Sequence, residues 1–302
     1  MFEIPQKKLR NGFSCPTFGL GTWLMGGDNK RIESPQDTLD IQLIKDAVSH
    51  GIAHIDTAEI YGDNHTEELI GKALKDLQRD TVFLASKAQK GHHTQDLLIK
   101  ALDNSLRRLK TDYLDLYYLH RYTPETPLEE SAAALNIALK QGKIKNVGVC
   151  NFSISHVNEL QKHLDTKIFA NQVHYNLAFR EPELSGLISH AEHNDYFVIA
   201  WRPLRLRKRN DDTPCISHNA WETGAFPILD DMAQKYNCSN VQIAISWVTH
   251  HPNVLTLVKS SHIDRLLEAA QGTRVKLSEP DYLYLSRNFK PQHQKSDTIS
   301  LE

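Results

Sequence analysis

Short apolar segments recur along the chain, and segments with the periodicity of amphipathic helices separate them. Runs of this kind are typical of buried parallel strands. We expect eight strands, at residues 18–23, 52–56, 81–87, 114–120, 146–151, 168–173, 196–201 and 254–258. Strands that alternate with helices predict a parallel sheet, either a closed eightfold barrel or an open doubly wound sheet.

Helix signals occur in the intervening segments. We expect helices at residues 66–77, 94–109, 155–163, 184–194, 226–236, 240–250 and 261–271. Two more begin at "SPQD" and "TPLE", where Ser34 and Thr126 are the expected N-caps and a proline follows at the first helical position. The pair Asn11-Gly12 predicts a β-hairpin before the first of the eight strands.

The spacing of the strand ends favours the barrel. The ends at Asp56, Lys87, His120 and Asn151 are separated by 31, 33 and 31 residues, as expected for regular βα units. The first strand is followed by neither a GxGxxG motif nor a Walker lysine, so nothing indicates a phosphate loop there. No linker rich in Pro, Gly or Ser divides the chain, and we expect one domain over residues 1–302.

Composition excludes several classes of partner. The formal net charge of -2 gives no field that would attract nucleic acid or a membrane surface, and no apolar run reaches transmembrane length. The four cysteines are widely scattered and indicate reduced thiols in a cytoplasmic protein. The pairs His92-His93 and His250-His251 lack carboxylate partners, so we expect no metal site, and no obligate protein partner is evident.

Four polar residues fall where the strands of a barrel end. In such a fold the carboxyl ends of the strands converge on the face that holds the active site. Asp56, Lys87 and His120 end three consecutive predicted strands, and Tyr61 lies in the loop above the first of these. Each has an ordinary structural explanation by itself, such as a helix cap, a solvated lysine or a core histidine. Together they predict one catalytic cluster.

This cluster suits carbonyl reduction. A phenol with a pKa near ~10 is a poor proton donor at neutral pH, and the ammonium of Lys87 beside Tyr61 should lower that pKa. Asp56 would hold the ammonium, and a neutral His120 would direct the carbonyl oxygen toward Tyr61. Because none of these side chains can supply hydride, the chemistry requires a nicotinamide cofactor.

The motifs that carry a resemblance are, in order, "LGTW", "IDTAEIYG", "LASK", "YLDLYYLH", "GKIKNVGVCNF", "NQVHYN", "IAWRPL" and "LVKSSHIDRLLEA". Over nearly its whole length the chain resembles the aldo-keto reductase superfamily. The resemblance implies an α/β fold, a (β/α)8 TIM barrel with extra helices near the C-terminus. It also implies the catalytic tetrad Asp56, Tyr61, Lys87 and His120, with Tyr61 as the proton donor.

The resemblance also implies an NADPH site. It puts Gly21, Thr22 and Trp23 beside the nicotinamide and substrate, with Asp56 nearby. The amides of Asn151 and Gln172 would hold the carboxamide, and Trp201 would stack on the ring. The remaining expected cofactor contacts are Arg202, Pro203, Leu204, Lys259, Ser260, Arg265 and Glu268. Of these, Lys259 and Arg265 suit the 2′-phosphate of NADP, and Glu268 the adenine end.

The chain departs from the family pattern at Cys150, Arg202, His262 and Ala269. These differences affect the details of how the cofactor would be bound. A basic run after the seventh strand has two interpretations. It could clamp the pyrophosphate, or it could be a solvated loop balanced by Asp211 and Asp212. The run consists of Arg202, Arg205, Arg207, Lys208 and Arg209.

We therefore expect an NADPH-dependent reductase of small aldehydes or ketones, whose partner is a small carbonyl substrate. Trp23, Tyr61, His120 and Arg121 are the expected substrate contacts. Arg121 could select dicarbonyls or carboxylated aldehydes, or it could turn away and pair with Glu125. The alternatives are an NADPH-binding barrel that acts as a redox sensor or regulatory subunit, and a metal-dependent barrel hydrolase built on Asp56 and His120.

Overall fold

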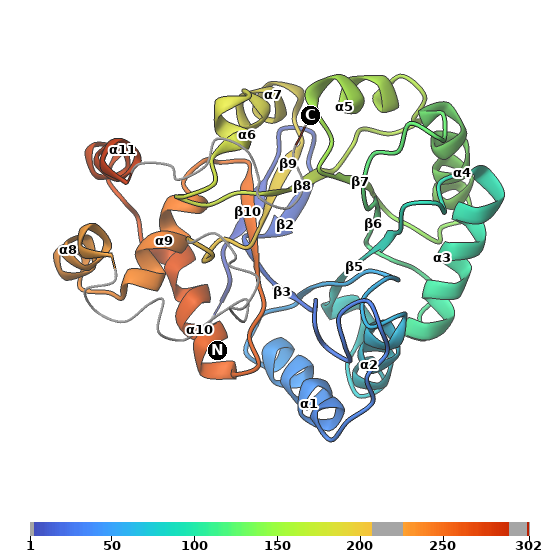
Figure 1. The fold of residues 1–302 in the computed structure, drawn as a ribbon, viewed down its shortest axis with the longest axis horizontal. Helices are drawn as coiled ribbons and strands as arrows, with labels where there is room; N and C mark the ends of the chain where they lie inside the picture. The colour runs from blue at the N-terminus through green and yellow to red at the C-terminus, as the bar shows by residue number, and fades with distance from the viewer. Residues whose placement is uncertain (1–2, 207–225, 290–300, 302) are drawn as a thin grey trace. The chain divides into compact units, whose positions relative to one another are not determined.

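A computed structural model describes residues 3–206, 226–289 and 301 of the chain. It contains eight parallel barrel strands: β3 (Phe18–Gly21), β4 (His54–Asp56), β5 (Phe83–Ala88), β6 (Leu116–Leu119), β7 (Val147–Cys150), β8 (Ala170–His174), β9 (Phe197–Trp201) and β10 (Val254–Val258). The strands close in the order β10-β3-β4-β5-β6-β7-β8-β9 (Figure 1). The predicted (β/α)8 barrel is therefore confirmed.

Helices follow most of the strands. They are α1 (Gln36–Ser49), α2 (His65–Leu74), α3 (Gln95–Leu109), α4 (Leu128–Lys140), α5 (Ile154–Gln161), α6 (Glu181–Leu184), α7 (Leu187–Asn194), α8 (Pro227–Tyr236), α9 (Asn240–Val248), α10 (Ile263–Gln271) and α11 (Glu279–Asn288). Among the described residues there are also two short 3-10 helices, η1 (Arg79–Thr81) and η3 (Gly272–Arg274). Within the described parts of the chain, no helix combines the length and apolar character needed to cross a membrane.

The described residues group into two compact units. The first contains residues 3, 19–172 and 259–263, within the described ranges. In Figure 1 helices α1 to α4 lie on the outside of strands β3 to β6. The register places Asp56 beside Ala85 and Lys87 beside Tyr118. Because alternate residues of a strand point to the same side, Ala85 and Lys87 share one face of β5, and Asp56 is the strand-β4 neighbour of that face.

Helices α2 and α3 pack closely against each other in this unit. A Cβ atom on Gly71 of α2 would lie 2.1 Å from the carbonyl oxygen of Arg108 in α3, so only glycine allows this approach. Beside this contact, the buried carboxylate of Glu67 accepts hydrogen bonds from Arg108 Nε at 2.7 Å and from Ser86 Oγ at 2.6 Å. Strand β5 is thus connected to both helices at the residue before Lys87.

The second unit contains residues 4–18, 173–258 and 264–302, within the described ranges. Strands β1 (Gln6–Lys8) and β2 (Ser14–Pro16) form the predicted N-terminal hairpin, with Gly12 at a φ of +94° in the connection. The ammonium of Lys7 donates to the carbonyl oxygens of Thr249, His251 and Val254 at 2.5, 2.6 and 2.7 Å. The hairpin is thereby fixed to the connection between α9 and β10.

Several helix ends differ from the predictions. Pro35 and Pro127 are the N-cap residues of α1 and α4, so the expectation of Ser34 and Thr126 at these positions is wrong. The helix predicted at 184–194 begins only at Leu187, as α7, and Gly186 with a φ of +78° separates it from the short helix α6, which ends at Leu184. Helix α11 was not predicted, although Ser278 caps it by accepting a hydrogen bond from the backbone of Asp281.

Candidate active site

The ammonium of Lys87 is the centre of the cluster at the strand ends. It donates to Asp56 Oδ1 at 2.5 Å, to the Thr57 carbonyl oxygen at 2.7 Å and to Tyr61 Oη at 3.4 Å. The side chains of Lys87 and Asp56 are 0% and 4% exposed. A buried charge requires an opposite charge and hydrogen-bond partners, and this set of contacts supplies both.

Asp56 is fixed by three further hydrogen bonds. Gln172 Nε2 donates to Asp56 Oδ2 at 2.8 Å. The backbone carbonyl oxygen of Asp56 accepts from Thr22 N at 3.1 Å and from Thr22 Oγ1 at 2.9 Å. Asp56, which binds Lys87, is therefore fixed both by strand β8 and by the residue that follows β3. No local pattern predicts the contact between Asp56 and Gln172, because the two residues lie 116 positions apart.

The aromatic rings of Tyr61 and His120 contact each other near the ammonium of Lys87. The two rings lie edge to face, with centroids 5.8 Å apart and an interplanar angle of 75°. Lys87 Nζ lies 5.0 Å from the centroid of the Tyr61 ring. His120 directly follows β6, and its backbone N–H donates to the Ala88 carbonyl oxygen at 3.0 Å. The structure thus brings together the four residues of the predicted tetrad.

The electrostatics of the cluster differ from the expectation in one respect. Desolvation raises the pKa of Tyr61, and the charge of Lys87 lowers that pKa only in part. The expected net fall in the phenol pKa is therefore wrong, because desolvation of the phenolate outweighs the nearby cation.

The other two ionisable groups follow the expectation. Burial first, and then the charges of Lys87 and Arg121, holds the pKa of His120 well below its usual range, so the imidazole is neutral. Burial alone would lower the pKa of Lys87, but the charge of Asp56 and other neighbouring groups raise the pKa above its ordinary value, so the ammonium is retained.

Cys150 and Asn151 lie next to each other where β7 ends. Cys150 is 1% exposed, and burial raises the pKa of its thiol. Asn151 is also buried, has a φ of 57°, and its backbone N–H donates to the Gln172 carbonyl oxygen at 3.0 Å. The backbone at this departure from the family pattern is therefore fixed to β8.

The expected substrate contacts outside the tetrad lie in two loops. Gly21 ends β3, and Trp23 follows with its indole Nε1 donating to Asp28 Oδ1 at 2.9 Å. Arg121 is exposed, and no carboxylate within residues 3–206, 226–289 and 301 pairs with it. Glu125 accepts from Thr123 and lies 3.5 Å from Lys90, so it does not take Arg121 as its partner.

In the second unit, Trp201 ends β9 and stacks on His174, with ring centroids 4.4 Å apart and an interplanar angle of 14°. His174 stacks on Phe179 as well, also at 4.4 Å. Arg202 has a φ of 54°, and its guanidinium lies 5.1 Å from the centroid of the Trp201 ring. Asn176 Nδ2 donates to the Arg202 carbonyl oxygen at 2.8 Å, which fixes the start of the basic run.

The remaining members of that segment vary in exposure. Pro203 is buried, and Leu204 and Arg205 are partly exposed. The positions Arg207, Lys208, Arg209, Asp211 and Asp212 lie outside the described residues, so both interpretations of the basic run stay predictions.

The residues expected at the 2′-phosphate surround the start of α10 in the sequence. In the first unit, Lys259 Nζ donates to Ser261 Oγ at 3.0 Å, and Ser260 Oγ donates to the His262 carbonyl oxygen at 3.1 Å. Burial lowers the pKa of Lys259, and the buried acid Asp40 of α1 acts in the opposite direction. Arg265 and Glu268 lie three positions apart on α10 in the second unit.

The expectation that the two histidine pairs lack carboxylate partners is wrong, since His92 contacts Glu59 at 3.0 Å and His250 contacts Glu279 at 3.1 Å. No group of three or more histidine, cysteine or acidic residues suited to a metal ion occurs in the described part of the chain. The contacts that sequence reasoning missed are Thr22 and Gln172 on Asp56, Thr57 on Lys87, and Asp28 on Trp23. Thr57 acts through its backbone, which no side-chain motif reveals, and an aspartate in a polar loop has no distinguishing signal.

Comparison with known proteins finds relatives along nearly the whole chain. The Aldo/keto reductase family model matches residues 17–287. The methylglyoxal reductase YeaE of Escherichia coli is 33% identical over 91% of this chain and 92% of that protein. The glyoxal reductase of Bacillus subtilis is 30% identical over 91% and 89%. An aldo/keto reductase of Klebsiella pneumoniae, crystallised with NADP and acetate, is 30% identical with a TM-score of 0.82 and full coverage of both chains. The chain belongs to the aldo/keto reductase family.

Proposed function

We propose that this protein reduces small aldehydes or ketones to alcohols with NADPH, and that Tyr61 is the proton donor. The observation that supports the proposal most directly is the position of the Lys87 ammonium, which contacts both the Asp56 carboxylate and the Tyr61 hydroxyl. A lysine that is buried, charged and in contact with a phenol stabilises the phenolate that proton donation leaves behind.

The chain's residues fit a nicotinamide cofactor. Gln172 uses its amide nitrogen on Asp56, so its amide oxygen is the atom that would accept a hydrogen bond from the carboxamide, with Asn151 beside it. Trp201 is supported on His174 and would stack against the ring. Lys259 and Arg265 would bind the 2′-phosphate. When bound, the reduced nicotinamide supplies the hydride that no side chain can provide.

The proton-transfer part of the reaction follows from the tetrad. The neutral imidazole of His120 donates a hydrogen bond to the substrate carbonyl oxygen and directs it to Tyr61 Oη. As the oxygen gains negative charge, Tyr61 transfers its phenolic proton to it. Lys87 then faces a phenolate at 3.4 Å, while Asp56 and Thr57 keep the ammonium in place. Each unit by which Lys87 lowers the phenol pKa corresponds to about 1.4 kcal/mol in favour of the phenolate.

We further propose short polar carbonyls, dicarbonyls in particular, as the substrate class. Arg121 adjoins His120 and presents a guanidinium fork that suits vicinal oxygens or a carboxylate. The pKa of His120 is lowered by burial first, then by the charge of Lys87, and then by the charge of Arg121. Two relatives are named for the reduction of methylglyoxal and glyoxal, both of which are dicarbonyls. The cytoplasmic location and the absence of an obligate partner stay predictions.

The test is NADPH oxidation by the purified protein, followed by absorbance, with a panel of carbonyls in the presence and absence of a chelator. Methylglyoxal, a carboxylated aldehyde and an uncharged aromatic aldehyde form the panel. We expect chelator-independent turnover that is fastest with the polar substrates. Tight NADPH binding without turnover would support the sensor alternative, and activity that a chelator abolishes would support the metal-dependent one.

A further inference from the structure

The loop that carries Trp23, residues 22–33, packs closely on the segment that carries Tyr61. The Gly62 backbone N–H donates to the Asp28 carbonyl oxygen at 2.6 Å, and Thr66 Oγ1 donates to the Met25 carbonyl oxygen at 2.5 Å. Within the loop, the Ile32 N–H donates to the Gly26 carbonyl oxygen at 2.8 Å. The loop is therefore ordered by backbone contacts on both sides of Asp28.

Glycines allow this close approach. A Cβ on Gly26 would lie 2.6 Å from Cδ2 of His65, and a Cβ on Gly62 would lie 2.8 Å from the Gly26 carbonyl oxygen. Both residues also have positive φ angles, +69° and +55°. Two backbones thus touch directly at this place, which leaves little freedom for the loop to shift relative to Tyr61.

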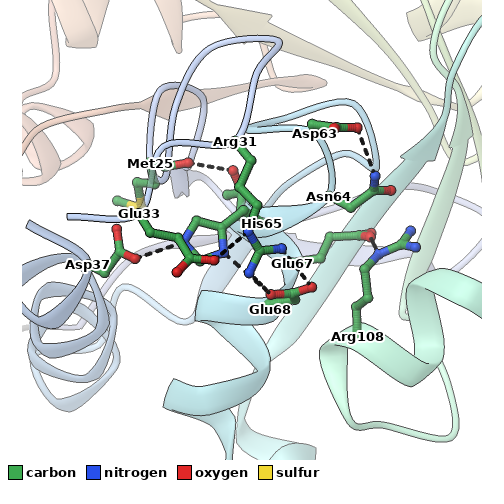
Figure 2. Close-up of polar contacts among 11 residues, drawn as sticks. Met25, Arg31, Glu33, Asp37, Asp63, Asn64, His65, Glu67, Glu68 and Arg108 are labelled. Atoms are coloured by element: carbon green, nitrogen blue, oxygen red, sulfur yellow. Dashed lines mark hydrogen bonds and ion pairs between the residues drawn. The ribbon is translucent and has the colours of Figure 1, made fainter.

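Ion pairs hold the far end of the loop, as Figure 2 shows. Arg31 makes a bidentate contact with Glu68 of α2, at 3.1 and 2.8 Å, and contacts Glu33 at 2.7 Å. His65 is buried and joins Asp37 of α1, at 2.7 Å, to Glu68, at 3.4 Å. Single surface pairs contribute little, but a bidentate pair within a network fixes geometry.

Asp28 connects Trp23, the residue proposed to line the substrate site, to the segment that carries Tyr61. Its backbone oxygen binds Gly62, the residue after Tyr61, and its side chain accepts the indole N–H of Trp23 at 2.9 Å. We infer that Asp28 is a positioning residue that sets the orientation of the Trp23 indole relative to Tyr61, and thereby determines the affinity for the carbonyl substrate. The inference rests on the proposed function, in which Trp23 lines the substrate site.

The physical reason is the direction of the hydrogen bond on a partly exposed indole. Trp23 is only partly buried, and an indole has a single N–H donor, so the partner of Nε1 constrains the orientation of the ring. A charge-assisted hydrogen bond to Asp28 selects the rotamer that points Nε1 at the carboxylate. Because Asp28 is exposed, its side chain can be changed without opening a cavity or leaving a buried group unsatisfied.

The experiment compares Asp28→Ala and Asp28→Asn with the native protein, and Asn29→Ala, the exposed neighbour, serves as the matched control. The chain has four tryptophans, so Trp23→Phe identifies the Trp23 indole N–H signal in an NMR spectrum. In Asp28→Ala we expect a shifted Trp23 signal with faster hydrogen exchange. We also expect KM for the carbonyl to rise about 3–10-fold, the range of one lost hydrogen bond, while kcat and NADPH affinity stay within about twofold.

Asp28→Asn keeps an oxygen acceptor without the charge, so its KM and Trp23 signal should lie closer to the native values than those of Asp28→Ala, and Asn29→Ala should change neither readout. The inference is overturned if Asp28→Ala leaves the Trp23 signal unchanged, if the signal moves while KM does not, or if Asp28→Asn matches Asp28→Ala. A native protein that reduces no carbonyl would instead end the proposed function, and the indole signal would still decide whether Asp28 holds Trp23.

Discussion

Lys87 and Asp56 form a buried ion pair in which Lys87 Nζ lies 2.5 Å from Asp56 Oδ1. Neither partner can use water to satisfy its charge, so each depends on the other and on the surrounding amide and carbonyl groups. The pair belongs at once to the core of the barrel and to the proposed chemistry. Substitutions can separate these two contributions.

Tyr61→Phe keeps the ring and its packing but removes the phenolic proton. We expect kcat for carbonyl reduction to fall by about 10²–10⁴-fold, the usual contribution of a general acid. NADPH affinity should stay close to that of the native protein, which a fluorescence titration can measure. Reduction at the native rate by this variant would remove Tyr61 from the mechanism.

Lys87→Met leaves Asp56 buried without its cation. We expect the free energy of unfolding in urea to decrease by about 3–5 kcal/mol. The double variant Asp56→Asn/Lys87→Met removes both charges, so it should regain most of that stability while remaining inactive. If the double variant is as unstable as Lys87→Met alone, the loss of stability does not come from an uncompensated carboxylate.

The pH profile of reduction follows from the pKa shifts of Tyr61 and His120. Tyr61 must carry its proton, and desolvation raises its pKa above the ordinary value of 10.0, so the donor stays protonated at neutral and moderately alkaline pH. His120 must be neutral, and its pKa lies well below 6.5. We therefore expect kcat/KM for reduction to be flat from about pH 6 to about pH 9 and to fall only at higher pH.

Lys87→Met provides the control for that profile. The charge of Lys87 lowers the phenol pKa in part, so its removal should shift the alkaline fall of any residual activity to still higher pH. A native profile that already falls with an apparent pKa below about 9 would contradict the assignment, because the phenol would then be more acidic than the structure indicates.

Lys259 and Arg265 should determine the preference for NADPH over NADH. Each charge-assisted contact with a 2′-phosphate contributes about 1.5–3 kcal/mol, so Lys259→Ala/Arg265→Ala should bind NADPH more weakly and leave NADH affinity nearly unchanged. Tryptophan fluorescence quenching measures both affinities. Lys162→Ala, which removes an exposed lysine paired with Glu159, is the control. Equal affinity of the native protein for both cofactors would refute the assignment.

Arg121→Ala tests the proposed substrate class. The ratio of kcat/KM for a carboxylated aldehyde to that for an uncharged aromatic aldehyde should fall by more than about threefold, or ~0.7 kcal/mol of differential transition-state binding. Lys90→Ala removes a neighbouring cation that pairs with Glu125 and should leave the ratio unchanged. A smaller change in Arg121→Ala would mean that this residue does not contact the substrate.

The sequence was sufficient to predict the eight strands and to place Asp56, Tyr61, Lys87 and His120 in one cluster, because both follow from local signals. Apolar runs predict the strands, and Asp56, Lys87 and His120 lie at, or within one residue of, the ends of β4, β5 and β6. The helix ends were harder to predict. Pro35 already has helical φ and ψ angles but lies one residue before α1, and only the local hydrogen bonds distinguish a cap from a first helical position.

The contacts that complete the site could not be predicted, because they join residues that are distant in the sequence or act through the backbone. Gln172 was expected to serve the cofactor alone, and its bond to Asp56 depends on the closure of the sheet around both strands. The pKa of Tyr61 was predicted with the wrong sign, since sequence shows which cation is near but not how completely water is excluded.

The burial of Cys150 has a consequence for the tolerance of the protein to its own substrates. A reactive aldehyde or dicarbonyl adds readily to a thiolate, and the thiolate rather than the thiol is the nucleophile. Because burial raises the pKa of Cys150, this side chain stays protonated at neutral pH beside a site that handles electrophiles. On the proposed function, the buried and protonated thiol contributes apolar volume next to Asn151 and is a poor nucleophile toward the carbonyl compounds that the site would reduce.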